Sequence, residues 1–268
     1  RLACGEPFAC RLSSIEQIVS GALYRIRARG DLAGRRIVIT AGPTHEPVDP
    51  VRYLSNASSG KMGYAIAAAA AAHGAHVTLV SGPVSLPVPA GVGVIHVTTA
   101  AQMLEATQDA FATADAAILA AAVSDYRPEQ AADHKLKKAA EPIDNIALAE
   151  NPDILATLSQ SRGSRVVIGF AAETDNVLEN ARKKLATKGC DLIVANDVSR
   201  DDSTFGSDTN RVTLVGPHDE TELDCMPKEQ VAEKIIERLH DLLEPDEPLQ
   251  QASAADQTLL MPRTGADC

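Results

Sequence analysis

Residues 36–80 read RIVITAGPTHEPVDPVRYLSNASSGKMGYAIAAAAAAHGAHVTLV, and this stretch decides the fold. A β-branched run opens it, an alanine-rich segment of helical length follows, and a second β-branched run closes it. A strand, a helix and a strand in this order predict a βαβ unit with two parallel strands. The connection before the helix is unusual, because Pro43, Pro47 and Pro50 stand in a polar loop.

The same alternation continues along the chain and predicts an α/β fold. We expect a Rossmann-like, doubly wound, mostly parallel sheet with helices on both faces, because the strand candidates are apolar along their whole length. The expected strands are Arg36–Thr40, Val77–Val80, Val94–Val97, Ala117–Ala120, Val166–Phe170 and Asp191–Ala195. An edge strand at Arg211–Val215 and a closing amphipathic helix at Lys228–Leu242 complete the expected domain.

Composition limits the classes of function. The chain of 268 residues with 45% hydrophobic content suffices for one sizeable α/β domain or two small ones. A formal net charge of -11 argues against nucleic acid or a membrane surface as partner, although small anionic ligands stay open. Scattered cysteines without CxxC pairs indicate a reducing, cytoplasmic location. We expect neither a membrane span nor export.

Ligands of a doubly wound sheet bind beyond the carboxyl ends of the strands, so the segments that follow the strands are the site candidates. Ser58–Lys61 stand where the first helix begins, and backbone N–H groups, hydroxyls and a lysine there can hold a phosphate. The stretch is not a Walker A loop, because no glycine stands five residues before Gly60 and Met62 replaces the magnesium-binding hydroxyl. A serine N-cap with close-packing glycines explains the same residues equally well.

Two further candidates follow later strands. Ala120–Arg127 passes from a buried strand into charge at Asp125, although an Asp-initiated turn is the commoner explanation. In His134–Lys138 an extended backbone would point Lys135 and Lys137 the same way, where they could neutralise a polyphosphate or simply be solvated.

A fourth candidate combines two segments. Asn151 and Pro152 are typical of an N-cap followed by proline at the first helical position. Lys184 and Lys188 lie four apart on the helix that follows Phe170–Thr174, and so share one face. Interaction with the helix dipole is the ordinary explanation for such lysines.

Six strings occur in the order ITAGPTHEPVDPVRYLSNASSGKMGYAIA, AAAVSDYRP, KLKK, ENPDIL, GFAAET and ANDVS. Together they resemble the synthetase half of the bifunctional phosphopantothenoylcysteine synthetase/decarboxylase family of coenzyme A biosynthesis, over residues 34–243. The resemblance implies a ligase that joins 4'-phosphopantothenate and L-cysteine through an acyl-cytidylate. The products would be 4'-phosphopantothenoylcysteine, CMP and pyrophosphate, with CTP as co-substrate and Mg2+ as the divalent cation.

The resemblance also implies roles for residues. Asn56 would hold an oxygen of the acyl-cytidylate, and Lys135 would close over the reactants in a flap, so that both are catalytic. The proline-rich loop would be a rigid arm that presents Arg52 and Asn56 to phosphopantothenate. The substrate-binding positions are Arg52, Ser58, Ser59, Gly60, Ala121 and Ala122. The nucleotide-binding positions are Asp125, Lys135, Pro152, Asp153, Ile154, Leu155, Phe170, Lys184 and Lys188. No metal ligands are assigned.

The resemblance further implies a homodimer, in which a segment near Asn196–Asn210 helps to complete the site across the interface. Residues 1–33 resemble a remnant of the decarboxylase flap and linker, with Cys4 at the position of the proton donor. The flavin domain is missing, and Glu6–Arg11 replaces the glycine-rich continuation of the motif, so we expect neither decarboxylation nor FMN from this chain. We expect residues 244–268 to be a disordered tail.

Two other classes of protein share this fold class. A Rossmann oxidoreductase would require GxGxxG after the first strand and an acidic residue ending the second, which instead ends Val80–Pro83. A binding protein without activity could keep nucleotide contacts, but it would not need Asn56 and Lys135 together. Pyrophosphate release that requires both CTP and phosphopantothenate separates the ligase from both alternatives.

Overall fold

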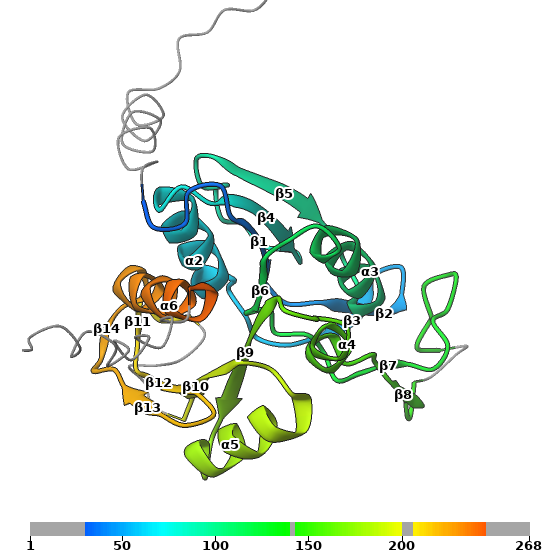
Figure 1. Ribbon diagram of the computed structural model, residues 1–268. Coiled ribbons are helices and arrows are strands. Elements are labelled where there is room, and N and C mark those ends of the chain that lie inside the picture. Colours follow the sequence, from blue (N-terminus) through cyan, green and yellow to red (C-terminus); the bar gives the residue numbers. More distant parts are fainter. Residues whose placement is uncertain (1–29, 140–142, 200–205, 245–268) are drawn as a thin grey trace, which may run out of the picture.

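The computed structural model describes residues 30–139, 143–199 and 206–244 (Figure 1). The expectations for the decarboxylase remnant up to residue 29 and for the tail after residue 244 lie outside the described residues.

An eight-stranded sheet in the order β13-β12-β10-β9-β6-β1-β4-β5 forms the centre of the molecule. The six strands β10, β9, β6, β1, β4 and β5 are parallel to one another. Strand β12 is antiparallel to β10, and β13 is antiparallel to β12. Their bounds are β1 Arg36–Ala41, β4 His76–Ser81, β5 Val92–His96, β6 Ala116–Leu119, β9 Val166–Glu173, β10 Leu192–Asp197, β12 Val212–Val215 and β13 Glu220–Glu222. The expected α/β, mostly parallel sheet is confirmed. The strand order reverses between β1 and β6, which makes that junction the switch point of the sheet.

Helices cover both faces of the sheet (Figure 1). Helices α2 (Lys61–Ala72) and α6 (Lys228–Leu243) pack on one face, where Ile66 and Ile235 meet Ile39 of β1 in one buried cluster. Helices α3 (Ala100–Phe111), α4 (Ile154–Gln160) and α5 (Val177–Lys188) pack on the other face, over Val38 and its neighbours. Consecutive residues of β1 therefore point to opposite cores, as the period of a strand requires. No helix in the described residues is long and apolar enough to cross a membrane.

Helix α2 approaches β1 closely, which positions the start of the helix beside the end of the strand. A Cβ on Gly63 would lie 2.5 Å from the Cβ of Ala41 and 3.0 Å from the carbonyl oxygen of Thr40. Only glycine leaves room for this approach. The alanines that follow, among them Ala67 and Ala70, are buried against the sheet and α6.

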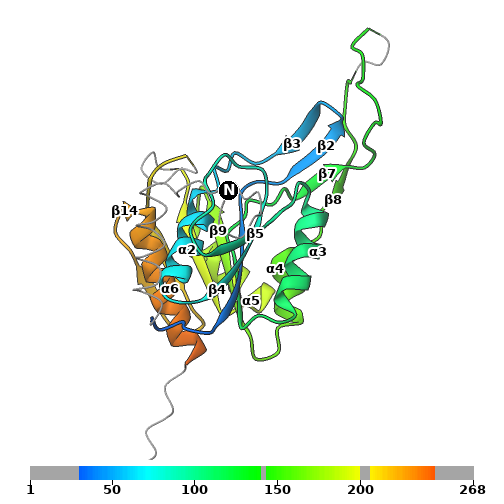
Figure 2. The same cartoon turned by 90° about the horizontal axis from the view of Figure 1, so that it is seen from above.

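Two hairpins project from the body of the molecule (Figure 2). Strand β2 (His45–Asp49) pairs with β3 (Arg52–Ser55), and β7 (Tyr126–Pro128) pairs with β8 (Leu148–Glu150). Ala132 N–H donates to the carbonyl oxygen of Val48 at 3.0 Å, which joins the two hairpins. We call residues 45–55, 126–139 and 143–150 the arm. The proline-rich loop of the sequence is therefore a hairpin, in which Pro47 stands opposite Tyr53.

Two local expectations are corrected. The strand expected at the edge, β12, is covered by β13, whose exposed residues Glu220–Glu222 form the actual edge. The N-cap expected at Asn151 is wrong, because Asp153 caps α4 and Pro152 precedes the helix. The remaining short pair, β11 (Thr209–Asn210) with β14 (Met226–Pro227), leads into α6.

Candidate active site at the switch point

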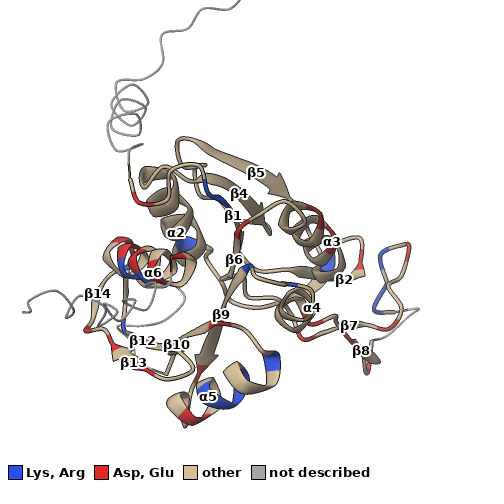
Figure 3. Ribbon diagram, in the orientation of Figure 1, with Lys and Arg blue, Asp and Glu red and all other residues tan. Residues whose placement is uncertain are grey.

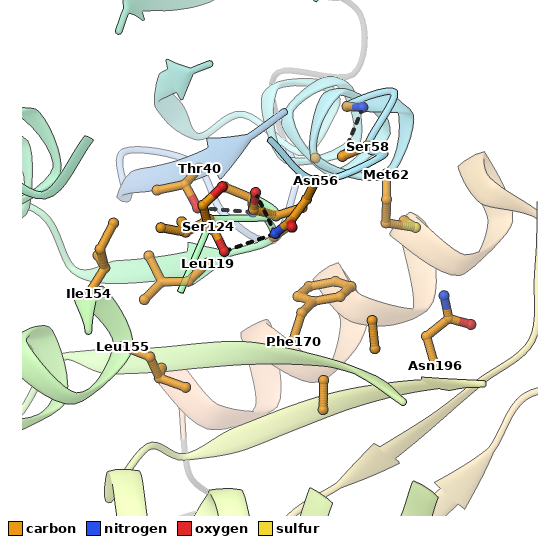
Figure 4. A pocket seen from close by; sticks show the side chains of 18 of the residues that line it. Thr40, Asn56, Ser58, Met62, Leu119, Ser124, Ile154, Leu155, Phe170 and Asn196 are labelled. Carbon is orange, nitrogen blue, oxygen red and sulfur yellow. Dashed lines mark hydrogen bonds between the residues drawn. The ribbon is translucent and has the colours of Figure 1, made fainter. Parts of the chain in front are cut away.

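A cleft of about 730 Å3 opens beyond the carboxyl ends of β1, β6, β9 and β10 (Figure 4). Thr40, Leu119, Phe170 and Asn196 line it from these four strands, and the start of α2 forms a further wall. The switch point between β1 and β6 lies at its floor, where the fold class places its ligands.

Backbone and hydroxyl contacts join the turns that follow β1 and β6. The Thr40 Oγ1 accepts from Ala121 N–H at 3.2 Å, and the Thr44 Oγ1 accepts from Ser124 N–H at 3.0 Å. Between them, Ala122 N–H donates to the carbonyl oxygen of Gly42 at 2.9 Å. Both threonines are buried, so these bonds hold the two turns as one rigid surface.

Asn56 connects the arm to that surface. Its Nδ2 donates to the carbonyl oxygens of Ala122 at 3.3 Å and Val123 at 3.0 Å, and its side chain projects toward the cleft in Figure 4. The preceding Ser55 Oγ donates to the carbonyl oxygen of Thr44 at 2.8 Å. These contacts fix the loop between the arm and α2 across the end of β6.

Helix α2 begins without a side-chain cap. Its N-cap is Gly60, with φ 77°, and Ser58 Oγ accepts from Gly60 N–H at 3.3 Å rather than from a backbone N–H of the helix. The serine N-cap considered from sequence is therefore wrong. A side chain at Gly60 would strain the backbone and would also stand 2.8 Å from Val84 Cγ1. Uncapped N–H groups at a helix start attract anions.

The opposite wall carries a capped helix and an ion pair. Asp153 Oδ1 accepts from Ala156 N–H at 2.8 Å, and Asp153 Oδ2 accepts from Lys188 Nζ at 2.6 Å. Burial opposes ionisation of Asp153, but these two bonds outweigh it and hold the pKa of the carboxyl below its usual value. Lys184 Nζ donates to the carbonyl oxygen of Phe170 at 2.8 Å. Asn151 Nδ2 donates to the carbonyl oxygen of Ser124 at 2.9 Å, which explains why it does not cap α4.

The cleft brings together most of the site residues expected from sequence. These are Asn56, Ser58, Ser59, Gly60, Ala121, Ala122, Asp125, Pro152, Asp153, Ile154, Leu155, Phe170 and Lys184. Arg52, Lys135 and Lys188 do not line it. Lys188 stands behind Asp153, whereas Arg52 and Lys135 lie on the arm.

Three further residues line the cleft: Lys61, from the expected phosphate-binding start of the first helix, Asn210, from the end of the segment expected to complete the site, and Lys228. Of these, Lys228 was missed from sequence. Lys61 Nζ donates to Asp208 at 2.6 Å, and Lys228 Nζ donates to the carbonyl oxygen of Ser207. Lys228 is only 4% exposed; burial, and then the nearby Lys61 charge, lower the pKa of its ammonium. A lysine that opens a helix opposes the helix dipole, and this was the available signal for Lys228.

Among the described residues, no three His, Cys, Asp or Glu side chains are grouped so that they could hold a metal ion. Carboxylates still line the cleft at Asp125, Glu150 and Asp153.

Residues 32–243 match the family described as DNA/pantothenate metabolism flavoprotein C-terminal domain. The chain belongs to this family. It is 49% identical over 214 residues to the coenzyme A biosynthesis bifunctional protein CoaBC of Vibrio parahaemolyticus, over 79% of this chain and 54% of that protein. The chain thus spans about half the length of this curated relative. The family expected from the six strings is confirmed.

Solved structures agree in fold. The crystal structure of the C-terminal domain of coenzyme A biosynthesis bifunctional protein CoaBC matches with TM-score 0.70 and 43% identity, over 81% of this chain and all of that one. A Cab2 mutant in complex with phosphopantothenate-cysteine matches with TM-score 0.64 and 17% identity, over 87% of this chain and 96% of that one. At that identity the second match supports the fold alone.

Proposed function

We propose that this chain is a phosphopantothenate–cysteine ligase that forms 4'-phosphopantothenoylcysteine through an acyl-cytidylate. The observation that carries the proposal is the cleft, since it gathers residues from five of the six recognised strings at the switch point of the sheet. Membership of the family, and similarity to proteins named for coenzyme A biosynthesis, support the same activity.

The reaction has two steps. A carboxylate oxygen of phosphopantothenate attacks the α-phosphorus of CTP and pyrophosphate leaves. The amine of L-cysteine then attacks the acyl carbon, CMP leaves with the bonding electrons, and the nitrogen loses a proton. The protein's part is to hold the reactants in line and to stabilise the charge that develops on oxygen. Asn56 can exchange its longer bond, to the Ala122 carbonyl at 3.3 Å, for an oxygen of the acyl-cytidylate.

The walls of the cleft suit a nucleotide. In this proposal the phosphates bind at the uncapped start of α2 and beside Lys184, while Pro152–Leu155 contact the base. Mg2+ usually keeps water and phosphate ligands and takes one or two carboxylates, and it would neutralise charge on the triphosphate. Asp125 is a lining carboxylate that can serve it there. Preference for CTP over ATP rests on the family resemblance.

We further propose a homodimer in which the arm of one copy completes the cleft of the other. Two observations support it: Arg52 and Lys135 lie on the arm and outside their own cleft, and the arm exposes large apolar side chains. Val51 is 57% exposed, Tyr53 55% and Leu148 51%. Large apolar side chains exposed together on one surface are typical of interaction sites. A cytoplasmic location also stays a prediction.

The test is pyrophosphate release and product mass with purified chain, phosphopantothenate, Mg2+ and either CTP or ATP, with and without L-cysteine. We expect product with CTP, accumulation of the acyl-cytidylate in Asn56→Asp, and loss of pyrophosphate release in Lys135→Gln. Lys234→Gln is the matched control, because Lys234 lies on α6 and pairs only with Glu237 among the described residues. A folded dimer that releases no pyrophosphate with either nucleotide would leave a binding role in place of the ligase.

A further inference from the structure

The carboxylate of Asp49, at the end of β2, is enclosed within the arm. Its side chain is fully shielded from solvent, whereas that of Arg52 is 43% exposed. Asp49 Oδ1 accepts from the backbone N–H of Val51 at 2.9 Å and of Arg52 at 3.0 Å, which closes the turn between β2 and β3. The carboxylate thus uses one oxygen for the hairpin itself.

The other oxygen of Asp49 reaches outside the hairpin. Its Oδ2 accepts from Arg52 Nε at 2.9 Å, from Arg52 Nη2, and from Leu136 N–H at 3.2 Å. Arg52 Nη2 also donates to the carbonyl oxygen of Leu136 at 2.8 Å. Both backbone polar groups of Leu136 are therefore held by the Asp49–Arg52 pair. The hydrogen bonds from Arg52 are the main cause that lowers the pKa of Asp49 to about 2, against the opposing effect of burial.

Leu136 stands between two lysines of the KLKK string. Its side chain lines a groove of about 410 Å3 with Val48 and Ile146, so the residue is anchored by apolar contact as well as by its backbone. The neighbouring Lys135 and Lys137 are exposed. The position of the lysine backbone is consequently set by an ion pair on a different hairpin.

The guanidinium of Arg52 is oriented by the same pair. Its Nε and Nη2 edge faces Asp49, and Nη1 makes no hydrogen bond within the described residues. An arginine carries five N–H donors in a planar fork, so Nη1 keeps two donors for an anionic oxygen while the other edge stays occupied. Arg52 can bind a ligand without releasing Asp49.

We propose that Asp49 is a positioning residue that holds Arg52 and the Lys135–Lys137 segment as one unit, so that Arg52 Nη1 and Lys135 meet the anionic groups of the substrate together. This rests on the proposed function, which makes those groups the phosphate of phosphopantothenate and the phosphates of the nucleotide. Asp49 itself does not touch the substrate. Its effect is on the placement of the two cations, whichever copy's cleft they serve.

The decisive variant is Asp49→Asn. In the orientation that keeps the Oδ1 acceptor for the turn, the new amide nitrogen faces the donors of Arg52 and Leu136, so the hairpin closes but the link to Leu136 is lost. Glu46→Gln is the matched control. Glu46 is a buried carboxylate on the same strand, and it accepts from Ala100 N–H at 2.9 Å without touching Arg52 or Leu136.

Three quantities are measured: amide hydrogen exchange of peptides covering residues 133–139, phosphopantothenate affinity by calorimetry, and KM and kcat for pyrophosphate release. For Asp49→Asn we expect exchange at Leu136 to accelerate about tenfold or more, and affinity and KM to worsen by about 10- to 100-fold, the scale of one hydrogen bond to a charged group. Glu46→Gln leaves all three near wild type. The lysine of Arg52→Lys cannot bridge Asp49 and Leu136 together. We expect this variant to shift exchange and affinity in the same direction by a smaller factor. It replaces Asp49→Asn in the test if that variant does not fold.

The proposal would be overturned if Asp49→Asn kept the wild-type exchange rate and affinity. It would also be overturned if Asp49→Asn and Glu46→Gln lost affinity equally, because Asp49 would then have a merely structural role. Absence of pyrophosphate release from the wild type would instead sink the ligase activity. In that case exchange and calorimetric affinity still decide whether Asp49 positions the two cations.

Discussion

Lys228 shows what burial does to a single cation. Its ammonium is nearly enclosed at the start of α6, and burial with the Lys61 charge lowers its pKa below the ordinary 10.5. Above the lowered pKa the folded chain binds fewer protons here than the unfolded chain, so this residue makes stability rise with pH up to about 10.5.

We predict that Lys228→Met removes this contribution, and that its unfolding free energy rises less between pH 8 and pH 10.5 than that of the wild type. Urea unfolding at several pH values measures the difference. Lys234→Met, on the exposed face of α6, is the control and should follow the wild-type slope. Identical slopes in wild type and Lys228→Met would contradict the assigned effect of burial.

Two cysteines on described residues should differ sharply in reactivity. Cys190 is 6% exposed, and burial raises the pKa of its thiol to about 11, whereas Cys225 is partly exposed. Because the thiolate is the reactive form, we predict that iodoacetamide at pH 8 modifies Cys225 in the folded protein and Cys190 only after unfolding. Peptide mass mapping over a time course measures both rates. Equal rates in the native state would show that the site of Cys190 opens to solvent.

Residue patterns predicted the site unevenly. Asn56 and Phe170 were assigned through the family resemblance, and Asp125 also because its segment follows a buried strand; the fold brings all three to one cleft. Lys228 reaches the cleft from the start of α6, and its neighbours in sequence carry no motif. The family resemblance placed Arg52 on a rigid arm, but the sequence did not show that this arm is a β-hairpin, because its prolines indicated a loop.

At the scale of elements, the contact between α2 and β1 determines the shape of the cleft wall. We predict that Gly63→Ala destabilises the protein by about 1–3 kcal/mol, because the added methyl would stand 2.5 Å from the Cβ of Ala41 and must displace helix or strand. Urea unfolding measures the change. Ala68→Ser lies on the exposed side of the same helix and should change stability by about 0.5 kcal/mol or less. A stability of Gly63→Ala equal to that of the control would show that α2 can move away at no cost.

The elements that sequence predicted are those with a clear hydrophobic pattern. The parallel strands carry uninterrupted apolar runs, and the predicted bounds of β1 and β4 lie close to those observed. The hairpin of β2 and β3 contains Pro47. A two-stranded pair tolerates proline, because the outer edge of each strand needs no backbone N–H donor. From sequence, however, the prolines indicated a loop. Strand β13 is short, polar and exposed, and only pairing with β12 identifies it.

At the scale of the whole molecule, net charge and local charge differ. The chain carries a net charge of -11, yet Lys and Arg gather on α5 and on the arm loop that follows β7 (Figure 3). The arm extends away from the body (Figure 2); its Arg52 and Lys135 do not line their own cleft, whereas Lys184 of α5 does. An acidic protein can thus present two separate basic surfaces, and a symmetric dimer is the simplest arrangement that would bring them together.

The dimer makes a prediction about mixed subunits. Arg52→Ala has a defective arm and an intact cleft, and Asn56→Asp has the reverse, so each is expected to be inactive alone. After equimolar mixing and exchange, half of the dimers contain one of each, and each of these has one cleft in which both Arg52 and Asn56 are intact. Product formation should therefore recover to about a quarter of the wild-type rate, if subunits pair at random in a two-fold dimer. No recovery would mean that Arg52 serves its own cleft.

A second variant tests the interface itself. Leu148→Asp, introduced into both chains, places a charge at an exposed apolar residue of the arm. We expect it to abolish both the recovery of activity and the dimer, whose loss sedimentation measures. Val88→Asp, at a comparably exposed residue outside the arm, should leave both unchanged.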